Sequence, residues 1–182
     1  MNAPTNGAFV VPLEVAQVTH AHLRAKGTEV SEGVVLWIGT FEPPVITRAV
    51  VPEQETSAGR FRVPLHARQQ LTRELAGSGQ MLVAQVHSHP QAAFHSPVDD
   101  VEAIPRRVGT YSLVVPDFGA RPHLLDGAAL YQLADDGRWI ETSPLAFAVP
   151  ETFAPLRPVP PPKGSLWRRL TDTLRRLGRS RT

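Results

Sequence analysis

Alternating apolar runs and polar breaks divide the first 150 residues into short segments. Runs rich in β-branched and aromatic residues predict the following buried or half-buried strands: 34–38, 45–51, 81–89, 111–115, 128–133 and 139–140. Looser helical spacing predicts helices over 12–26, with Gly27 as the stop, and from Pro64 to residue 75. Strands interleaved with two longer helices and one short helix indicate an α/β (α+β) domain.

The pattern changes at residue 155. A series of prolines predicts an extended linker over 155–164. Beyond it, leucines recur at helical spacing among arginines, so residues 165–182 are expected to form a basic amphipathic tail. Such a tail can dock a partner or the domain itself, stay disordered, or lie on a membrane, which is the least favoured choice. The predicted folded domain is therefore 1–154.

Charge and composition narrow the function. Residues 1–154 carry 11 basic and 16 acidic side chains, and residues 155–182 carry 8 basic and 1 acidic, so the body has no basic surface suited to nucleic acid. The chain has no cysteine, which excludes disulfides and thiolate metal sites. Neither a long apolar span nor a signal-peptide pattern is visible, and the expected location is the cytoplasm.

The most informative stretch lies at the end of the strand predicted over 81–89. His87 and His89 are two residues apart, so an extended chain presents both imidazoles to the same side. Pro90 then stops the strand, and Asp99 can bring a carboxylate to the same place. Two imidazoles and one carboxylate are the three protein ligands of a catalytic zinc ion, whose fourth position is left for water.

This stretch, His-Ser-His-Pro followed by a short loop and Ser-x-x-Asp, resembles the signature of the JAMM (MPN+/JAB) zinc metalloproteases. Family members usually have about ten residues between the second histidine and the aspartate, whereas nine separate His89 from Asp99 and ten separate it from Asp100. We expect Asp99 to be the ligand, because it keeps Ser-x-x-Asp intact. Ser96 and Pro97 also have the pattern of an N-cap and a first helical residue. Asp100 is the alternative.

The resemblance also implies catalytic residues. Family members carry a glutamate at the start of an early strand, often with a glycine seven residues later. Glu32 and Gly39 have this spacing, although Val35 stands where the usual pattern has a further glycine. Glu32 is therefore expected to be the general base that takes a proton from zinc-bound water, with Glu29 as the alternative. Ser96 is expected to help stabilise the oxyanion besides capping its helix.

For the whole molecule, the resemblance covers about residues 10–150. It implies a mixed, curved β-sheet flanked by helices, with one zinc ion per chain at the sheet's edge. The implied activity is that of an isopeptidase or peptidase acting at the C-terminus of a ubiquitin-like or sulfur-carrier protein, with E1-like and E2-like proteins as partners. The alternative is a non-catalytic MPN scaffold, which would require broken ligands. A zinc deaminase would need cysteines that the chain lacks.

Other polar residues near these motifs are expected to be structural or solvated: His20, His22, His66, Ser88, His95, Asp117 and His123. His95 departs from the common family pattern, and we expect it to be solvated rather than to touch substrate. Asp117 is expected to belong to a turn over residues 116–119.

Overall fold

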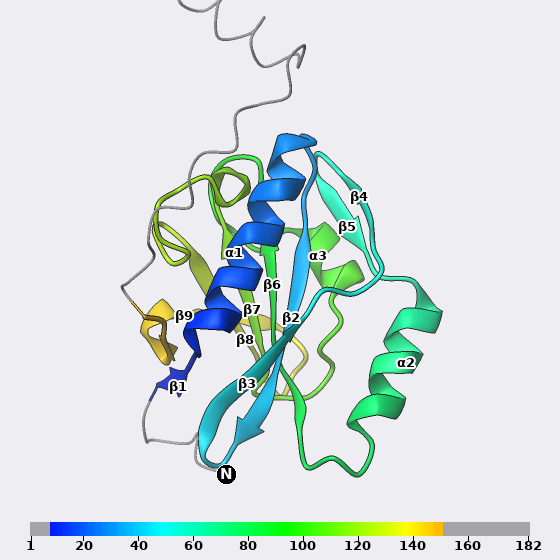
Figure 1. Cartoon of the computed structure of the whole chain (residues 1–182). Helices are drawn as coiled ribbons and strands as arrows, with labels where there is room; N and C mark the ends of the chain where they lie inside the picture. Colours follow the sequence, from blue (N-terminus) through cyan, green and yellow to red (C-terminus); the bar gives the residue numbers. More distant parts are fainter. Residues whose placement is uncertain (1–7, 151–182) are drawn as a thin grey trace, which may run out of the picture.

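Eight strands form one mixed, curved sheet in the computed structural model, which describes residues 8–150 (Figure 1). They are β1 (Phe9–Val10), β2 (Val34–Phe41), β3 (Pro44–Val50), β6 (Met81–Ser88), β7 (Tyr111–Val115), β8 (Ala129–Leu133), β9 (Trp139–Thr142) and β10 (Phe147–Ala148). Their order across the sheet is β10-β1-β3-β2-β6-β7-β8-β9. A separate ribbon consists of β4 (Glu55–Ser57) and β5 (Arg60–Arg62). The expected mixed α/β fold is confirmed.

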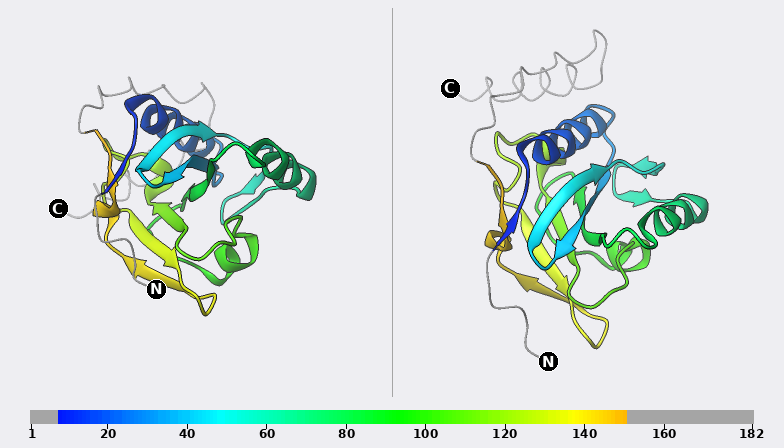
Figure 2. Two further views of the ribbon diagram at one scale, coloured as in Figure 1. Left: turned by 90° about the horizontal axis from the view of Figure 1, so that it is seen from below. Right: turned by 60° about the horizontal axis from the view of Figure 1, so that its bottom comes forward.

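The helices cover the sheet unequally. They are α1 (Leu13–Thr28), α2 (Leu65–Leu75), α3 (Pro97–Glu102) and the 3-10 turns η1 (Asp117–Gly119) and η2 (Pro144–Ala146). The long helix α1 lies across one face, whereas α2, α3 and the β4–β5 ribbon lie on the other side of β2 and β6 (Figures 1 and 2). The central strands are therefore covered on both faces.

This double cover explains the unbroken apolar run of β2, which is buried as predicted. Val35 and Trp37 belong to the core on the α1 side. Val34, Leu36 and Ile38 point to the opposite face and belong to a second core with residues of β5 and α2. The Trp37 Nε1–H donates to Thr19 Oγ1 of α1 at 2.8 Å. This bond fastens α1 to the strand that begins two residues after Glu32.

The first helix ends at Thr28, one residue beyond the stop expected at Gly27. A Cβ atom at Gly27 would lie 2.5 Å from Cβ of Phe118 in η1. The glycine therefore also permits close packing of α1 against η1.

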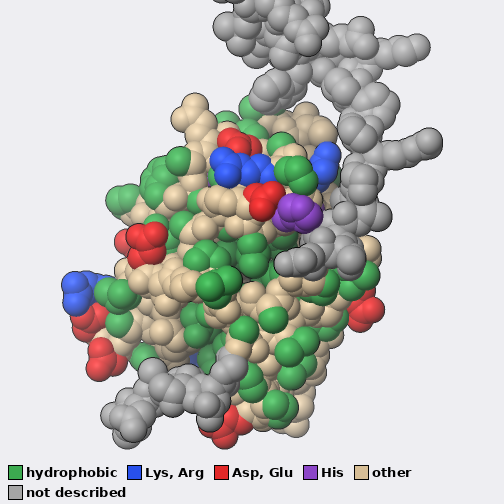
Figure 3. Space-filling view, turned by 90° about the vertical axis from the view of Figure 1, so that its left-hand side faces the viewer, with side chains coloured by type: hydrophobic (Ala, Val, Ile, Leu, Met, Phe, Trp, Pro, Cys, Tyr) green, Lys and Arg blue, Asp and Glu red, His purple; other side chains and the backbone are tan. Residues whose placement is uncertain are grey.

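Four short strands were not expected. β1 and β10 have two residues each, β4 lies in a segment that reads as a polar loop, and β5 follows it. β1 pairs in parallel with both β10 and β3, so these short segments extend one side of the sheet. On the face that carries β1 and β10, hydrophobic side chains are spread over the middle (Figure 3). The described part of the chain also ends beside this edge, at residue 150.

The predicted linker, 155–164, and the predicted tail, 165–182, lie outside the described residues. Within residues 8–150, none of the helices combines the length and apolar character that a bilayer-spanning segment needs.

Gly39 provides a test of packing between β2 and β3. The pairing of these strands shifts register between Ile38 and Gly39, and a Cβ atom at Gly39 would overlap the carbonyl oxygen of Val45. Because that atom belongs to the backbone, we expect Gly39→Ala to lower the free energy of unfolding by about 2 kcal/mol or more. Urea denaturation measures this change.

Gly59→Ala is the matched control, because a Cβ atom at Gly59 would have no neighbour within 4 Å. Its free energy of unfolding should stay within about 0.5 kcal/mol of the parent. Equal stabilities of the Gly39 and Gly59 variants would contradict the close approach of the two strands.

Candidate metal centre and active site

His87 and His89 lie at the carboxyl end of β6. His87 pairs with Val34 of β2 on one side and with Val114 of β7 on the other, and its side chain is fully buried. His89 follows the strand, and its backbone N–H donates to the Val115 carbonyl at 2.9 Å. The candidate site therefore lies where a central strand of the sheet ends.

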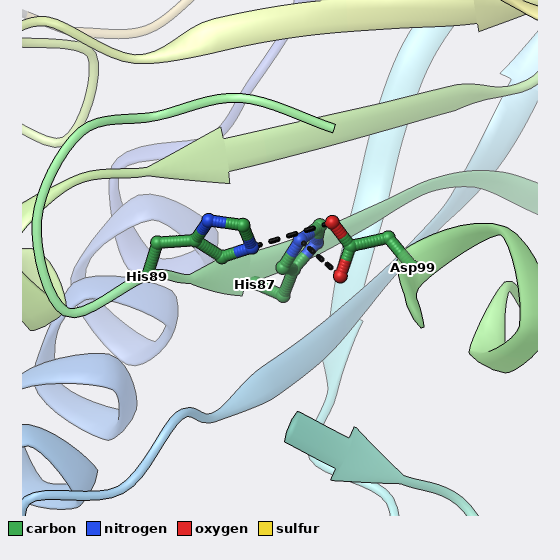
Figure 4. Close-up of side chains that lie close together, drawn as sticks. All are labelled: His87, His89 and Asp99. Atoms are coloured by element: carbon green, nitrogen blue, oxygen red, sulfur yellow. Dashed lines mark ion pairs between the residues drawn. The ribbon is translucent and has the colours of Figure 1, made fainter. Parts of the chain in front are cut away.

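Asp99 reaches the two histidines from the first turn of α3. The Ser96 side chain accepts a bond from the Asp99 N–H at 3.2 Å, and the Asp99 carboxylate accepts one from the Ser96 N–H at 2.7 Å. This capping box confirms the predicted helix start at Ser96 and Pro97. Carboxylate oxygens of Asp99 lie 3.3 Å from Nε2 of His87 and 3.3 Å from Nε2 of His89 (Figure 4).

The three side chains fit a metal ion. Among residues 8–150 they form the one group of at least three potential ligands whose atoms all lie within 4.8 Å of one another. Neither ring nitrogen of His87 has a hydrogen-bond partner in the described part of the chain, although both are buried. An unsatisfied buried nitrogen is costly, and coordination to a metal would satisfy it.

The ionisation states also suit ligation. Burial lowers the pKa of His87, which keeps the ring neutral. Burial opposes ionisation of Asp99, but the two histidines and the Ser96 N–H outweigh it and hold the pKa of this carboxyl well below its usual range. A neutral imidazole and an ionised carboxylate are the forms that bind metals.

Asp100, the alternative ligand, points elsewhere. Its side chain is 60% exposed, and its carboxylate lies 3.3 Å from Nδ1 of His95. The structure therefore brings Asp99, and not Asp100, to His87 and His89. The roles of these residues as ligands remain predictions that metal analysis can test.

Glu32 is held in the buried turn before β2. It is 3% exposed, and its N–H donates to the Ser57 carbonyl of β4 at 2.8 Å. Burial raises the pKa of its carboxyl to about 7, with an opposing effect from His89 and a further increase from the charge on Asp99. Glu29, the alternative base, is 58% exposed and pairs with Lys26 at 2.9 Å. Of these two glutamates, Glu32 is therefore the one whose charge interacts with the His87–His89–Asp99 group.

The raised pKa of Glu32 predicts a pH-dependent stability for metal-free protein. The folded chain holds this proton up to about pH 7, whereas the unfolded chain releases it near pH 4.5, so ionisation increasingly destabilises the fold as pH rises through this range. Glu32→Gln removes the effect. We expect its free energy of unfolding at pH 8 to exceed that of the parent by about 2 to 3 kcal/mol.

Urea denaturation after removal of metal with a chelator measures the difference. At pH 4.5 the two proteins should agree within about 0.5 kcal/mol, because the Glu32 carboxyl of the parent is then mainly protonated. Equal stability at both pH values would show that Glu32 titrates normally in the fold.

Ser88 and Gly33 join the two halves of the site. The Gly33 N–H donates to Ser88 Oγ at 3.1 Å, and the Ser88 N–H donates to the Gly33 carbonyl at 3.1 Å. Glu32 precedes Gly33, and Ser88 lies between the two histidines. The prediction that Ser88 is structural is confirmed, and its bonds keep the glutamate in register with the histidines.

Glu102 is a supporting residue that the sequence did not reveal. Its buried carboxylate accepts bonds from Arg60 of β5, at 3.0 Å from Nε, and from Arg68 of α2, at 3.4 Å. Glu102 lies one turn after Asp99 on α3. The two arginines therefore anchor the helix that carries Asp99. The sequence signal for Glu102 was its position three residues after Asp99 on the same helix. Its two arginine partners could not be identified, because they are remote in the sequence.

The expectation of a solvated His95 is wrong. The side chain is 5% exposed, and its ring stacks on Trp139 with centroids 5.0 Å apart and an angle of 28° between the planes. Tyr131 contacts the other ring positions, with centroids 5.1 Å apart. Both aromatic residues belong to the β8–β9 hairpin, so the loop before α3 is packed against this hairpin.

The remaining polar candidates lie outside the metal group. His66 pairs with Glu53 at the surface, and the buried His20 bonds to the Gly119 carbonyl at 2.8 Å. Asp117 pairs with Arg121 at 2.8 Å within the turn after β7, as its structural assignment predicts. Neither these residues nor His22 or His123 belongs to the described cluster of potential ligands: His87, His89 and Asp99.

Comparisons with known proteins identify the family of the chain. No family model matches the chain. A probable metalloprotease of Sinorhizobium fredii is 36% identical over 137 residues, which cover 72% of this chain and 85% of the relative. The chain belongs to the JAMM/MPN family. Its His-x-His and Ser-x-x-Asp residues supply the JAMM/MPN motif at the buried group just described.

Solved structures were also compared with the chain. A Desulfitobacterium hafniense protein, determined in solution, has a TM-score of 0.56 and 19% identity, covering 80% of this chain and 95% of its own, so the two proteins share a fold. An Archaeoglobus fulgidus JAB1/MPN domain protein has a TM-score of 0.42 and 15% identity, covering 79% of this chain and 99% of its own.

Proposed function

We propose that the chain is a zinc-dependent isopeptidase or peptidase. Its substrate would be the peptide or isopeptide bond at the C-terminus of a ubiquitin-like or sulfur-carrier protein. The observation that carries the proposal is the buried His87–His89–Asp99 group with Glu32 beside it, in a member of the JAMM/MPN family. E1-like and E2-like proteins are the proposed partners, since they act on the same carrier proteins.

His87, His89 and Asp99 would hold the metal through two imidazole nitrogens and one carboxylate. A zinc ion bound there supplies a water molecule of lowered pKa and polarises the carbonyl of the scissile bond. Zinc is proposed over softer or harder metals because the group combines imidazole nitrogen with carboxylate oxygen and the chain has no cysteine.

Glu32 would move the proton. Its carboxylate takes a proton from the attacking water and gives it to the nitrogen of the leaving amine. Burial raises the pKa of Glu32 and so favours the protonated carboxyl, which suits a group that must hold the proton between the two steps. The bonds between Ser88 and Gly33 hold this glutamate in place, so no large movement of the main chain is required.

Ser96 would act at the oxyanion. Its Oγ accepts the N–H of Asp99, which leaves the hydroxyl hydrogen available for donation. A donor aimed at the developing negative charge stabilises the tetrahedral intermediate. The helix-capping and catalytic roles of Ser96 are therefore compatible.

Cleavage of defined fusions tests the proposal. The zinc-loaded protein is incubated with ubiquitin-like and sulfur-carrier proteins that bear either a linear C-terminal extension or an isopeptide-linked peptide. We expect cleavage directly after the carrier's C-terminal residue, lost with a chelator and restored by zinc, as measured by intact-mass spectrometry. Failure of a fully zinc-loaded protein to cleave any of these fusions would contradict the proposed substrate class.

A further inference from the structure

We propose that a pocket next to the metal centre is a subsite for an acidic side chain of the substrate polypeptide. The pocket has a volume of about 470 Å³ and lies between the α3 region and the β8–β9 hairpin. The residues that give it its chemistry are His95, Asp100, Arg106, Tyr131, Arg138 and Trp139. The inference rests on the proposed function, because it assigns the pocket to the substrate of a peptidase.

The pocket lies beside the candidate active site. Its wall includes His95, whose ring centroid lies 6.5 Å from that of His87. It also includes Asp100, the residue after Asp99. A polypeptide bound with its scissile bond at the His87–His89–Asp99 group therefore passes near the pocket, where a neighbouring side chain can enter.

An unpaired arginine of the pocket favours an anion. The lining includes the guanidinium groups of Arg106 and Arg138 and the carboxylate of Asp100. Arg138 already pairs with Asp136 at 2.7 Å, but no ion pair or hydrogen bond engages the Arg106 guanidinium within residues 8–150. Arg106 is therefore the cation that remains for an acidic side chain of a ligand.

The walls suit a peptide side chain rather than a free ion. The His95 ring stacks on Trp139 and contacts Tyr131, which gives flat surfaces for the methylene groups of a glutamate. The hairpin pairs Leu133 with Trp139 and Gln132 with Ile140, so the aromatic residues are positioned before any ligand binds. A preformed wall reduces the entropy lost on binding.

Trp139 supplies a direct readout of occupancy. Trp37 is fully buried in the core on the α1 side, and the third tryptophan, Trp167, lies outside the described residues and is replaced by phenylalanine in all proteins tested, so quenching by a ligand in the pocket reports on Trp139. The probes are blocked tetrapeptides of glycine and alanine in which one glutamate occupies each position in turn, with glutamine versions as controls. They are titrated into the full-length, zinc-loaded Glu32→Gln protein, in which cleavage is suppressed.

We expect one glutamate peptide to bind about five- to tenfold more tightly than its glutamine version, through a charge-assisted contact with Arg106. Introducing Arg106→Gln into the Glu32→Gln protein should abolish this preference. Arg107→Gln should preserve it, because the Arg107 guanidinium lies over the Phe41 ring, with Cζ 5.7 Å from the ring centroid, and does not line the pocket. Trp139→Phe should remove the quenching signal.

The proposal is overturned if no peptide quenches fluorescence at millimolar concentration, or if glutamate and glutamine peptides bind equally. It is also overturned if the preference survives Arg106→Gln, or if Arg107→Gln weakens it to the same extent. Binding is read without cleavage, so a protein that lacks peptidase activity can still show the preference. Efficient cleavage of the carrier fusions, without any preference for glutamate over glutamine peptides, would contradict the subsite but not the proposed peptidase activity.

Discussion

Glu32→Gln is expected to keep the metal and to reduce turnover by about 10²- to 10⁴-fold. The amide has nearly the same shape as the carboxyl and can occupy the same buried place, but it cannot accept the proton of the attacking water. Glu32 is not part of the His87–His89–Asp99 group, so zinc content should be unchanged. Measuring kcat on a cleaved fusion, together with elemental analysis of the same sample, separates loss of chemistry from loss of metal.

Glu29→Gln is the matched control. It makes the same change three residues earlier, at a side chain that is mainly exposed and pairs with Lys26. Turnover should remain at the parental value, because Glu29 is solvated and a surface ion pair contributes little. Full activity in Glu32→Gln would contradict the assigned base, and loss of activity in Glu29→Gln alone would transfer the role.

His89→Ala is expected to reduce bound zinc from about one ion per chain to nearly none. Without one imidazole, only two protein ligands remain, and water has to fill the other coordination positions. Two protein ligands bind the ion much more weakly than three. Elemental analysis measures the stoichiometry. A zinc-dependent rise in Tm, expected for the parent and lost in the variant, shows that binding is to the folded state.

The control for this change is His66→Ala, because His66 is exposed and pairs only with Glu53 at the surface. It should retain the parental zinc content. Absence of zinc from the parent itself, even after reconstitution, would contradict the metallopeptidase proposal and favour a non-catalytic MPN scaffold. Unchanged zinc in His89→Ala would mean that the ion binds elsewhere.

A pair of neighbouring substitutions resolves the carboxylate ligand. Asp99→Asn should lower zinc content and Asp100→Asn should not, because only the Asp99 carboxylate faces both histidines. Both changes keep side-chain size and remove one negative charge, so each controls for the other. The opposite pattern would make Asp100 the ligand.

Local patterns allowed much of the candidate site to be predicted. The i, i+2 spacing of His87 and His89 places both rings on one side wherever the chain is extended. Ser96 and Pro97 define a helix start through their own preferences. The buried run of β2 likewise needs no information beyond its own residues, since its apolar character demands cover on both faces.

Contacts between remote segments could not be predicted in this way. His95 is buried by Trp139, 44 residues later, and nothing in the loop around His95 signals a stacking partner. Gly27 reads as a helix stop, but its close packing against Phe118 has no local signal. The two-residue strands β1 and β10 are too short to show a period, and pairing within the sheet alone defines them.

The anchoring of Glu102 by Arg60 and Arg68 has a consequence for the length of the loop before α3. Because α3 is fixed through the end that lies beyond Asp99, the preceding loop, residues 91–95, does not determine where the carboxylate stands. We therefore expect the metal group to tolerate deletion or insertion of one residue in the loop before His95. On this expectation, the spacing between the second histidine and the aspartate can differ between family members while the ligands keep their positions.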